Sequence, residues 1–108
     1  MKIKLISCLI LFTLSLSLSA LIPPDRPVRI LVVTGGHDYN AESLREMLVS
    51  LSPDITYQMA EFPAAYDMFL PVNRGRYDVL VFYHMWDKIT DDQARMFVDC
   101  IKSGKPVI

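Results

Sequence analysis

The sequence predicts an α/β protein with a flavodoxin-like, doubly wound parallel sheet between two layers of helices. Residues 28–34 and 77–84 are apolar along most of their length, which is typical of strands covered on both faces in a parallel sheet. Segments with helical periodicity alternate with these strands. The resulting order, β-α-β-(short α)-β-α-β, favours parallel strands with helices on both faces and right-handed crossovers.

The first half of this alternation is a strand, a helix and a second strand. Residues 28–34 (VRILVVT) follow a linker, residues 21–27, whose three prolines exclude a central strand. Residues 41–51 predict a helix that Asn40 caps. Its buried face should carry the apolar residues at helical spacing: Leu44, Met47, Leu48 and Leu51. Residues 55–60 (ITYQMA) predict the second strand.

The middle of the chain is less regular. Pro63 is a suitable start for a short helix that runs to Leu70, and Pro71 should stop it. Residues 77–84 (YDVLVFYH) predict the third strand.

The clearest helix is predicted over TDDQARMFVDCIKSG, residues 90–104. Thr90 and Gln93 form a capping box, and Asp91 and Asp92 complement the helix dipole at its N-terminus. The buried stripe should consist of four apolar residues: Ala94, Phe97, Val98 and Ile101.

A fourth strand begins near the end of the chain. Gly104 suits the position just after the helix, and KPVI, residues 105–108, starts the strand. Because three and a half strands leave core surface uncovered, we expect residues 28–108 to be the N-terminal part of a domain. The chain is then a fragment or a truncated reading frame.

Residues 1–20 have the layout of a secretory signal peptide. A positive MKIK is followed by the apolar LISCLILFTLSLSL and then by small residues, with cleavage expected after Ser19 or Ala20. The apolar run is short for a membrane-spanning helix. We therefore expect export to the periplasm or the medium, with only transient membrane insertion; an uncleaved N-terminal anchor is the alternative.

Charge and cysteine content exclude some functions. The net charge is −1, and removal of Lys2 and Lys4 with the leader takes it to −3, so the chain has no basic footprint for nucleic acid. Cys8 also leaves with the leader. Cys100 then has no partner for an intramolecular disulfide, and we expect it to be a buried, inert thiol.

The candidate functional residues lie in two loops that the predicted topology brings together. In the strand order 2-1-3-4-5, the first and third strands are neighbours at the switch point where ligands bind. Residues 35–40 (GGHDYN) follow the first strand, and residues 83–87 (YHMWD) end the third. The two histidines of the chain, His37 and His84, lie one in each segment. We expect both segments to overhang one crevice.

The residue types suggest roles within this crevice. His37 and His84 are the catalytic candidates, because imidazole titrates near neutral pH and suits general acid or base work. The binding candidates are Gly35, Gly36, Asp38, Tyr39, Trp86 and Asp87. Glycine allows positive φ and a close approach of the backbone to a ligand, and an indole is a platform for a sugar ring.

Each of these residues also has a structural explanation. His37 can be a turn residue, and His84 can be a half-buried residue that packs on the next helix. Asp38 can accept hydrogen bonds from N–H groups of its own loop. Trp86 can pack over the edge of the sheet as a lid. Backbone N–H groups before the helix at 41–51 are a further candidate for holding an anion or a hydroxyl.

Other chemistries lack their motifs. The chain contains no G-x-G-x-x-G, no P-loop sequence and no G-x-S-x-G elbow. The histidines and aspartates have no metal-type spacing, so neither a metal nor a cofactor is predicted.

Three segments together resemble the ThuA-like (trehalose-utilisation) family: ILVVTGGHDYN, MAEFPAAYDMFLP and YDVLVFYHMWDKITDDQARMFVDCIKSGKPVI. The resemblance covers residues 28–108. It implies the class I glutamine amidotransferase-like fold, a role in carbohydrate use and a small carbohydrate ligand. In true glutamine amidotransferases the nucleophilic cysteine follows the fourth strand, beyond Ile108. Cys100 lies in the preceding helix, so glutaminase activity is not expected.

The leading hypothesis is an exported ThuA-like domain that binds or processes a sugar derivative. His37, Asp38, His84 and Trp86 would line its crevice. A non-catalytic carbohydrate-binding or interaction module is the second hypothesis, and a non-functional truncated fragment is the third.

Overall fold

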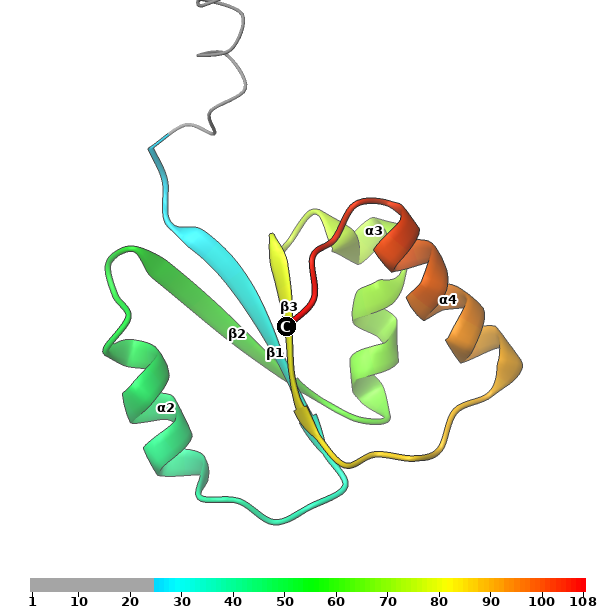
Figure 1. Ribbon diagram of the computed structural model, residues 1–108, viewed down its shortest axis with the longest axis horizontal. Helices are drawn as coiled ribbons and strands as arrows, with labels where there is room; N and C mark the ends of the chain where they lie inside the picture. Colours follow the sequence, from blue (N-terminus) through cyan, green and yellow to red (C-terminus); the bar gives the residue numbers. More distant parts are fainter. Residues whose placement is uncertain (1–24) are drawn as a thin grey trace, which may run out of the picture.

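A three-stranded parallel sheet forms the centre of the molecule (Figure 1). The computed structural model describes residues 25–108. In it, β1 (Val28–Gly35) lies between β2 (Ile55–Glu61) and β3 (Val79–His84), and both pairings are parallel. The order β2-β1-β3 confirms the predicted flavodoxin-like arrangement. The predicted signal peptide and residues 21–24 of the predicted linker lie outside the described residues.

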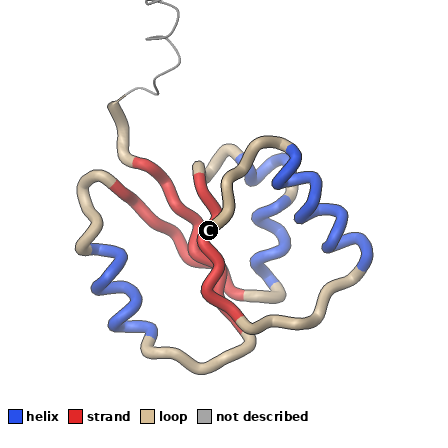
Figure 2. The backbone as a smooth tube through the Cα atoms, in the orientation of Figure 1, coloured by secondary structure: helices blue, strands red, loops and turns tan. Residues whose placement is uncertain are grey.

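Helices cover the two faces of the sheet unequally (Figures 1 and 2). One face carries α2 (Ala41–Val49). The other face carries the 3₁₀ helix η1 (Ala64–Phe69), the single-turn α3 (Pro71–Arg74) and α4 (Asp91–Lys102). All of the predicted helical segments are therefore helical, and the two-faced arrangement is confirmed.

The caps predicted from the sequence fix where the longer helices begin. Asn40 Oδ1 accepts the Ser43 N–H at 2.9 Å. Thr90 Oγ1 accepts the Gln93 N–H at 3.2 Å, and Gln93 Oε1 accepts the Thr90 N–H at 2.9 Å, which completes the capping box. A cap of this kind stabilises a helix by about 1 kcal/mol. Both helices therefore start at defined residues beside the carboxyl end of the sheet.

Residues 106–108 begin a fourth parallel strand on the outer side of β3, as predicted. Leu80 N–H donates to the Pro106 carbonyl oxygen at 3.0 Å, and Ile108 N–H donates to the Leu80 carbonyl oxygen at 2.9 Å. Phe82 N–H donates to the Ile108 carbonyl oxygen at 2.8 Å. A parallel bridge joins Leu80 and Val107. Gly104, with φ of 101°, makes the turn out of α4.

Side chains of β1 alternate between two apolar layers. Ile30 and Val32 point toward α2 and pack around Leu48. Leu31 and Val33 point toward η1 and α4 and belong to the larger layer. Its other buried residues are Phe62, Ala65, Tyr66, Phe69, Tyr77, Leu80 and Cys100. Each large side chain buried here contributes about 1.5–3 kcal/mol. The larger layer thus holds most of the core and forms the base of the site described below.

Two helix faces differ from the prediction. On α2 only Leu48 is fully buried, and Met47 is 54% exposed, because no other described helix packs beside α2 on that face. On α4 Val98 is 44% exposed, whereas Cys100 is completely buried. Successive residues of a helix are about 100° apart, so turning Phe97 and Cys100 toward the sheet leaves Val98 outside.

The first short helix ends before Pro71, as predicted, and Pro71 also starts a second one. The break between η1 and α3 falls at Leu70, whose backbone is extended with φ of −64° and ψ of 144°. A residue that precedes proline is pushed out of the helical region, whereas the fixed φ of proline suits the first helical position. The helix predicted over residues 63–70 is therefore η1, and α3 is a further short helix that was not predicted.

Asp78 joins the residues before β1 to the start of β3. Its Oδ2 accepts from the Arg26 guanidinium at 2.8 Å and from the Arg29 backbone N–H at 2.9 Å. Its Oδ1 accepts from Arg26 at 2.9 Å and from the Arg29 guanidinium at 3.0 Å. The hydrogen bonds from Arg26, and next those from Arg29, hold the pKa of Asp78 far below the usual carboxyl range. The folded chain therefore keeps this carboxylate ionised in acid.

Asp78→Asn is expected to lower the free energy of unfolding by about 1–2 kcal/mol at pH 7, because it removes charge-assisted bonds to two partly exposed arginines. In the unfolded chain the carboxyl takes up a proton near pH 4, before the folded chain does. The free energy of unfolding of the wild type therefore falls as the pH drops below that value. The difference in this free energy between the wild type and Asp78→Asn then becomes smaller. Urea unfolding at pH 7, 4 and 3 measures this difference. Asp99→Asn, on the exposed side of α4, is the matched control. A difference that stays constant down to pH 3 would contradict the assignment.

Candidate functional site

The loops after β1 and β3 lie against each other at the carboxyl end of the sheet, as predicted. Met85 N–H donates to the Gly35 carbonyl oxygen at 2.8 Å. Gly36 has φ of 79°, and a Cβ there would stand 2.5 Å from the Met85 carbonyl carbon. Only glycine combines this backbone conformation with such a close approach. The role of Gly36 is thus to let one loop pass directly over the other.

The side chains of these loops nevertheless point to opposite faces of the sheet. Alternation along β3 puts His84 on the side of η1 and α4, where its ring is 4.9 Å from that of Phe62. The neighbouring Tyr83 faces the α2 side and contacts the His37 ring, also at 4.9 Å. The turn at Gly36 carries His37 to this second face. The structure therefore does not bring the two histidines into one crevice.

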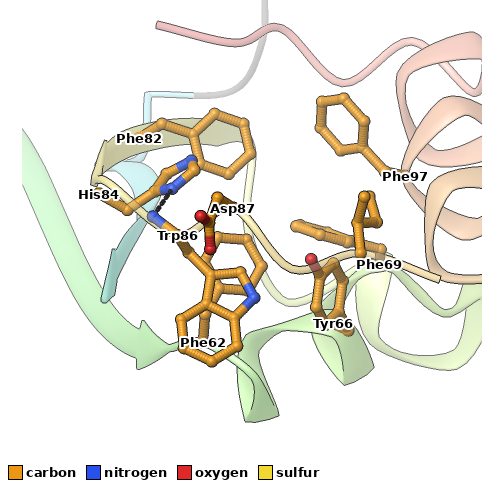
Figure 3. Close-up of a pocket in the computed structure, with 9 residues that line it drawn as sticks. Phe62, Tyr66, Phe69, Phe82, His84, Trp86, Asp87 and Phe97 are labelled. Carbon is orange, nitrogen blue, oxygen red and sulfur yellow. Dashed lines mark hydrogen bonds between the residues drawn. The ribbon is translucent and has the colours of Figure 1, made fainter. Parts of the chain in front are cut away.

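A cavity of about 290 Å³ opens on the η1 and α4 side of β3 (Figure 3). Aromatic rings make up most of its wall. The lining residues are Phe62, Tyr66, Phe69, Phe82, His84, Trp86, Asp87, Ile89 and Phe97. Three of the predicted site residues, His84, Trp86 and Asp87, lie in this wall. The predicted site residues of the first loop, in 35–40, do not line it.

Phe62 is the centre of the aromatic wall. Its ring centroid is 4.7 Å from that of Tyr66 and 6.3 Å from that of Trp86, to which it is nearly parallel at 16°. The Lys88 ammonium lies 5.9 Å from the Trp86 ring centroid. The indole is therefore both packed against the core and part of the cavity wall, which combines the two roles considered for it.

The backbone carbonyl of Lys88 holds the rim of the cavity in place. It accepts the Tyr66 hydroxyl at 2.8 Å and the Trp86 Nε1–H at 2.7 Å. The polar hydrogens of both rings are thus already used within the protein, while the Tyr66 hydroxyl oxygen can still accept a hydrogen bond. Beside that hydroxyl oxygen, Asp87 and His84 are the lining residues whose side chains can form hydrogen bonds with a ligand.

The hydrogen bond to His84 defines which of its nitrogens carries the proton. Trp86 backbone N–H donates to His84 Nδ1 at 3.1 Å. A backbone amide can only donate, so Nδ1 is the acceptor and the neutral ring carries its hydrogen on Nε2. His84 therefore presents Nε2–H as a hydrogen-bond donor.

The remaining candidates form a separate aromatic cluster on the α2 face. Ring centroids are 5.7 Å apart for His37 and Tyr39, and 5.6 Å apart for Tyr39 and Tyr83. Within the described residues, His37 Nδ1 is buried without a hydrogen-bond partner. Asp38 is exposed. The Asn40 side chain accepts the Ser43 N–H, which belongs to the first turn of α2.

Comparison with known proteins adds no relative. No family model, curated protein or solved structure matches this chain. Within residues 25–108, no group of three His, Cys, Asp or Glu side chains is placed to hold a metal ion. No helix in that range is long and apolar enough to cross a membrane.

Cys100 lies in the core, as predicted, and not at the cavity. It is completely buried, and its Sγ is 3.3 Å from the Tyr77 hydroxyl oxygen. That hydroxyl donates to the Met68 carbonyl oxygen at 2.8 Å, and burial raises the pKa of Tyr77 above its ordinary value. This pair is part of the packing under α4.

Sequence reasoning missed most of the cavity wall. Phe62, Tyr66, Phe69, Phe82 and Phe97 have the composition of ordinary core residues. One signal was present: Phe62, Tyr66 and Phe69 are spaced i, i+4 and i+7, so their rings gather on one side of the segment that contains η1. An aromatic face beside a predicted switch point is a sequence signal for the wall of a ligand site.

Proposed function

We propose that this chain is a ThuA-like domain whose aromatic cavity beside β3 binds one sugar ring or a derivative of similar size. The observation that carries the proposal is an aromatic wall in which two polar side chains, His84 and Asp87, remain to receive a ligand. The cavity volume of about 290 Å³ is near the small end of ligand pockets, which begin at about 300 Å³. That size suits one ring.

The chemistry of the wall supports a sugar. The C–H face of a pyranose packs on aromatic rings such as Trp86 and Phe62, since both surfaces are apolar. His84 Nε2–H donates to a ring or hydroxyl oxygen, and the Asp87 carboxylate accepts from a hydroxyl. One donor and one acceptor beside an apolar surface are the usual means of fixing the orientation of a small ligand.

The geometry favours binding over catalysis. Glycoside hydrolysis ordinarily uses two carboxylates on opposite sides of the bond, and Asp87 is the one carboxylate in the wall. An activated nucleophile would need a base within hydrogen-bond reach. The wall contains no serine, threonine, cysteine or lysine. We therefore prefer the binding-module hypothesis, with export resting on the leader-like residues 1–20.

Titration of the protein with a panel of methyl glycosides, uronic acids and oxidised sugars tests this proposal. We expect saturable amide shifts at Trp86 and His84, together with a change in fluorescence, because Trp86 is the single tryptophan of the chain. His84→Ala should weaken binding about tenfold, which corresponds to the loss of one hydrogen bond.

His37→Ala is the matched control, since it removes the other histidine from the opposite face of the sheet. It should leave the affinity unchanged. If His84→Ala and His37→Ala lose affinity equally, or if the amide shifts are confined to residues 37–39, the ligand does not bind in the cavity and the proposal is overturned.

A further inference from the structure

The charge of the cavity wall is entirely negative. Asp87 is the one charged residue among the lining residues, and no lysine or arginine is among them. Figure 3 shows its carboxylate among the aromatic side chains that surround the cavity. Asp87 is an exposed residue at the edge of the wall, so its attraction for a cation is screened by water and by salt.

The aromatic rings add to this preference. The face of an aromatic ring carries the negative part of its quadrupole, so it attracts cations and does not attract anions. Trp86 already has an ammonium group near it, that of Lys88 at 5.9 Å from the ring centroid. Phe62, Tyr66, Phe69, Phe82 and Phe97 contribute further rings to the same wall.

Acidic residues also outnumber basic ones around this end of the sheet. Acidic residues follow or begin the elements at this end of the sheet: Asp38, Glu61, Asp87, Asp91 and Asp92. Basic residues collect at the opposite end, before the strands begin: Arg26, Arg29, Arg74, Arg76, Lys102 and Lys105. Three basic residues also lie at the cavity end: Lys88 beside Trp86, Arg95 paired with Asp92, and Arg45 paired with Glu42. The remaining excess of acidic residues there favours the approach of cations.

We propose that the cavity selects ligands that carry an organic ammonium group, such as an amino sugar or an alkylammonium compound, over neutral ligands of the same shape. The ammonium group lies against the aromatic rings with Asp87 as its counter-ion, and His84 Nε2–H donates to an oxygen of the same ligand. This inference rests on the proposed function, because it assumes that the cavity is the ligand site.

Two pairs of probes differ in charge and hardly in shape: choline with 3,3-dimethylbutan-1-ol, and glucosamine with glucose. Amide shifts and tryptophan fluorescence at pH 7 and low ionic strength report binding. We expect the charged member of each pair to bind about tenfold more tightly, and the preference to weaken in salt.

Asp87→Asn should remove most of this preference, whereas Asp87→Glu, which keeps the charge, should retain it. Asp38→Asn is the control for a carboxylate of the adjacent loop that does not line the cavity. Circular dichroism verifies the fold of each variant.

Equal affinity within both pairs would overturn the inference and leave the proposed function intact. The inference also fails if the preference survives in Asp87→Asn. If neither the charged nor the neutral probes perturb the cavity, and the glycoside panel is silent as well, the proposed function fails with it.

Discussion

Gly36→Ala is expected to destabilise the fold by about 3 kcal/mol and to abolish ligand binding at the cavity. The new Cβ would stand 2.5 Å from the Met85 carbonyl carbon and 2.6 Å from the Trp86 nitrogen, which are backbone atoms that cannot rotate away. The positive φ adds strain of its own. Because Trp86 N–H is bonded to His84, moving this backbone displaces both cavity residues.

Alanine substitutions at two other glycines separate the steric clash of the new Cβ from the strain of the positive φ. Gly104 has φ of 101°, and no atom lies within 4 Å of the position that a Cβ would take there, so Gly104→Ala should cost about 1 kcal/mol, the strain alone. Gly75, with φ of −73° and open space around it, should tolerate alanine within about 0.5 kcal/mol. Urea unfolding of the three variants gives the comparison. A loss in Gly36→Ala no larger than that in Gly104→Ala would mean that the close approach of the loops has no energetic weight.

Phe69→Ala should have the largest effect of any single truncation at the cavity, about 3–5 kcal/mol. Phe69 is 1% exposed, and its ring lies between those of Phe62, Phe82 and Phe97 at centroid distances of 5.4–6.4 Å. Its loss leaves a void in the larger core layer and widens the cavity that the ring lines. Thermal or urea unfolding measures the effect.

Phe69→Leu, which keeps most of the volume, should cost less than Phe69→Ala and keeps the comparison usable if the alanine variant does not fold. Val72→Ala on the adjacent α3 is the surface control, because Val72 is 82% exposed; its change should stay within about 0.5 kcal/mol. A loss below 1 kcal/mol in Phe69→Ala would indicate that the wall is loosely packed.

The parts of the fold that depend on local sequence were predictable. The Asn40 cap and the capping box of Thr90 and Gln93 each involve residues three apart, so the sequence alone places them. The alternation of strands and helices likewise leads to the strand order. The exposed Met47 and Val98 were not predictable from periodicity, because burial depends on which neighbours a helix meets and on its rotation about its own axis.

The site was predictable to the level of adjacent loops and no further. The topology places the loop after Gly35 beside Met85. The face of the sheet on which a side chain lies depends, in addition, on the alternation along the strand and on the turn that follows it. Alternation in β3 separates Tyr83 from His84, which the sequence does reveal. The direction of His37 depends on the positive φ of Gly36, which only the three-dimensional structure provides.

The shared acceptor at the Lys88 carbonyl has a consequence for the kinetics of recognition. Tyr66 and Trp86 are fixed by bonds within the protein, so a molecule that enters between them orders few additional side-chain rotors. Little conformational entropy is then lost in forming the complex. Association should be governed by diffusion and by the long-range field, and differences in affinity among ligands should lie mainly in how fast each of them leaves.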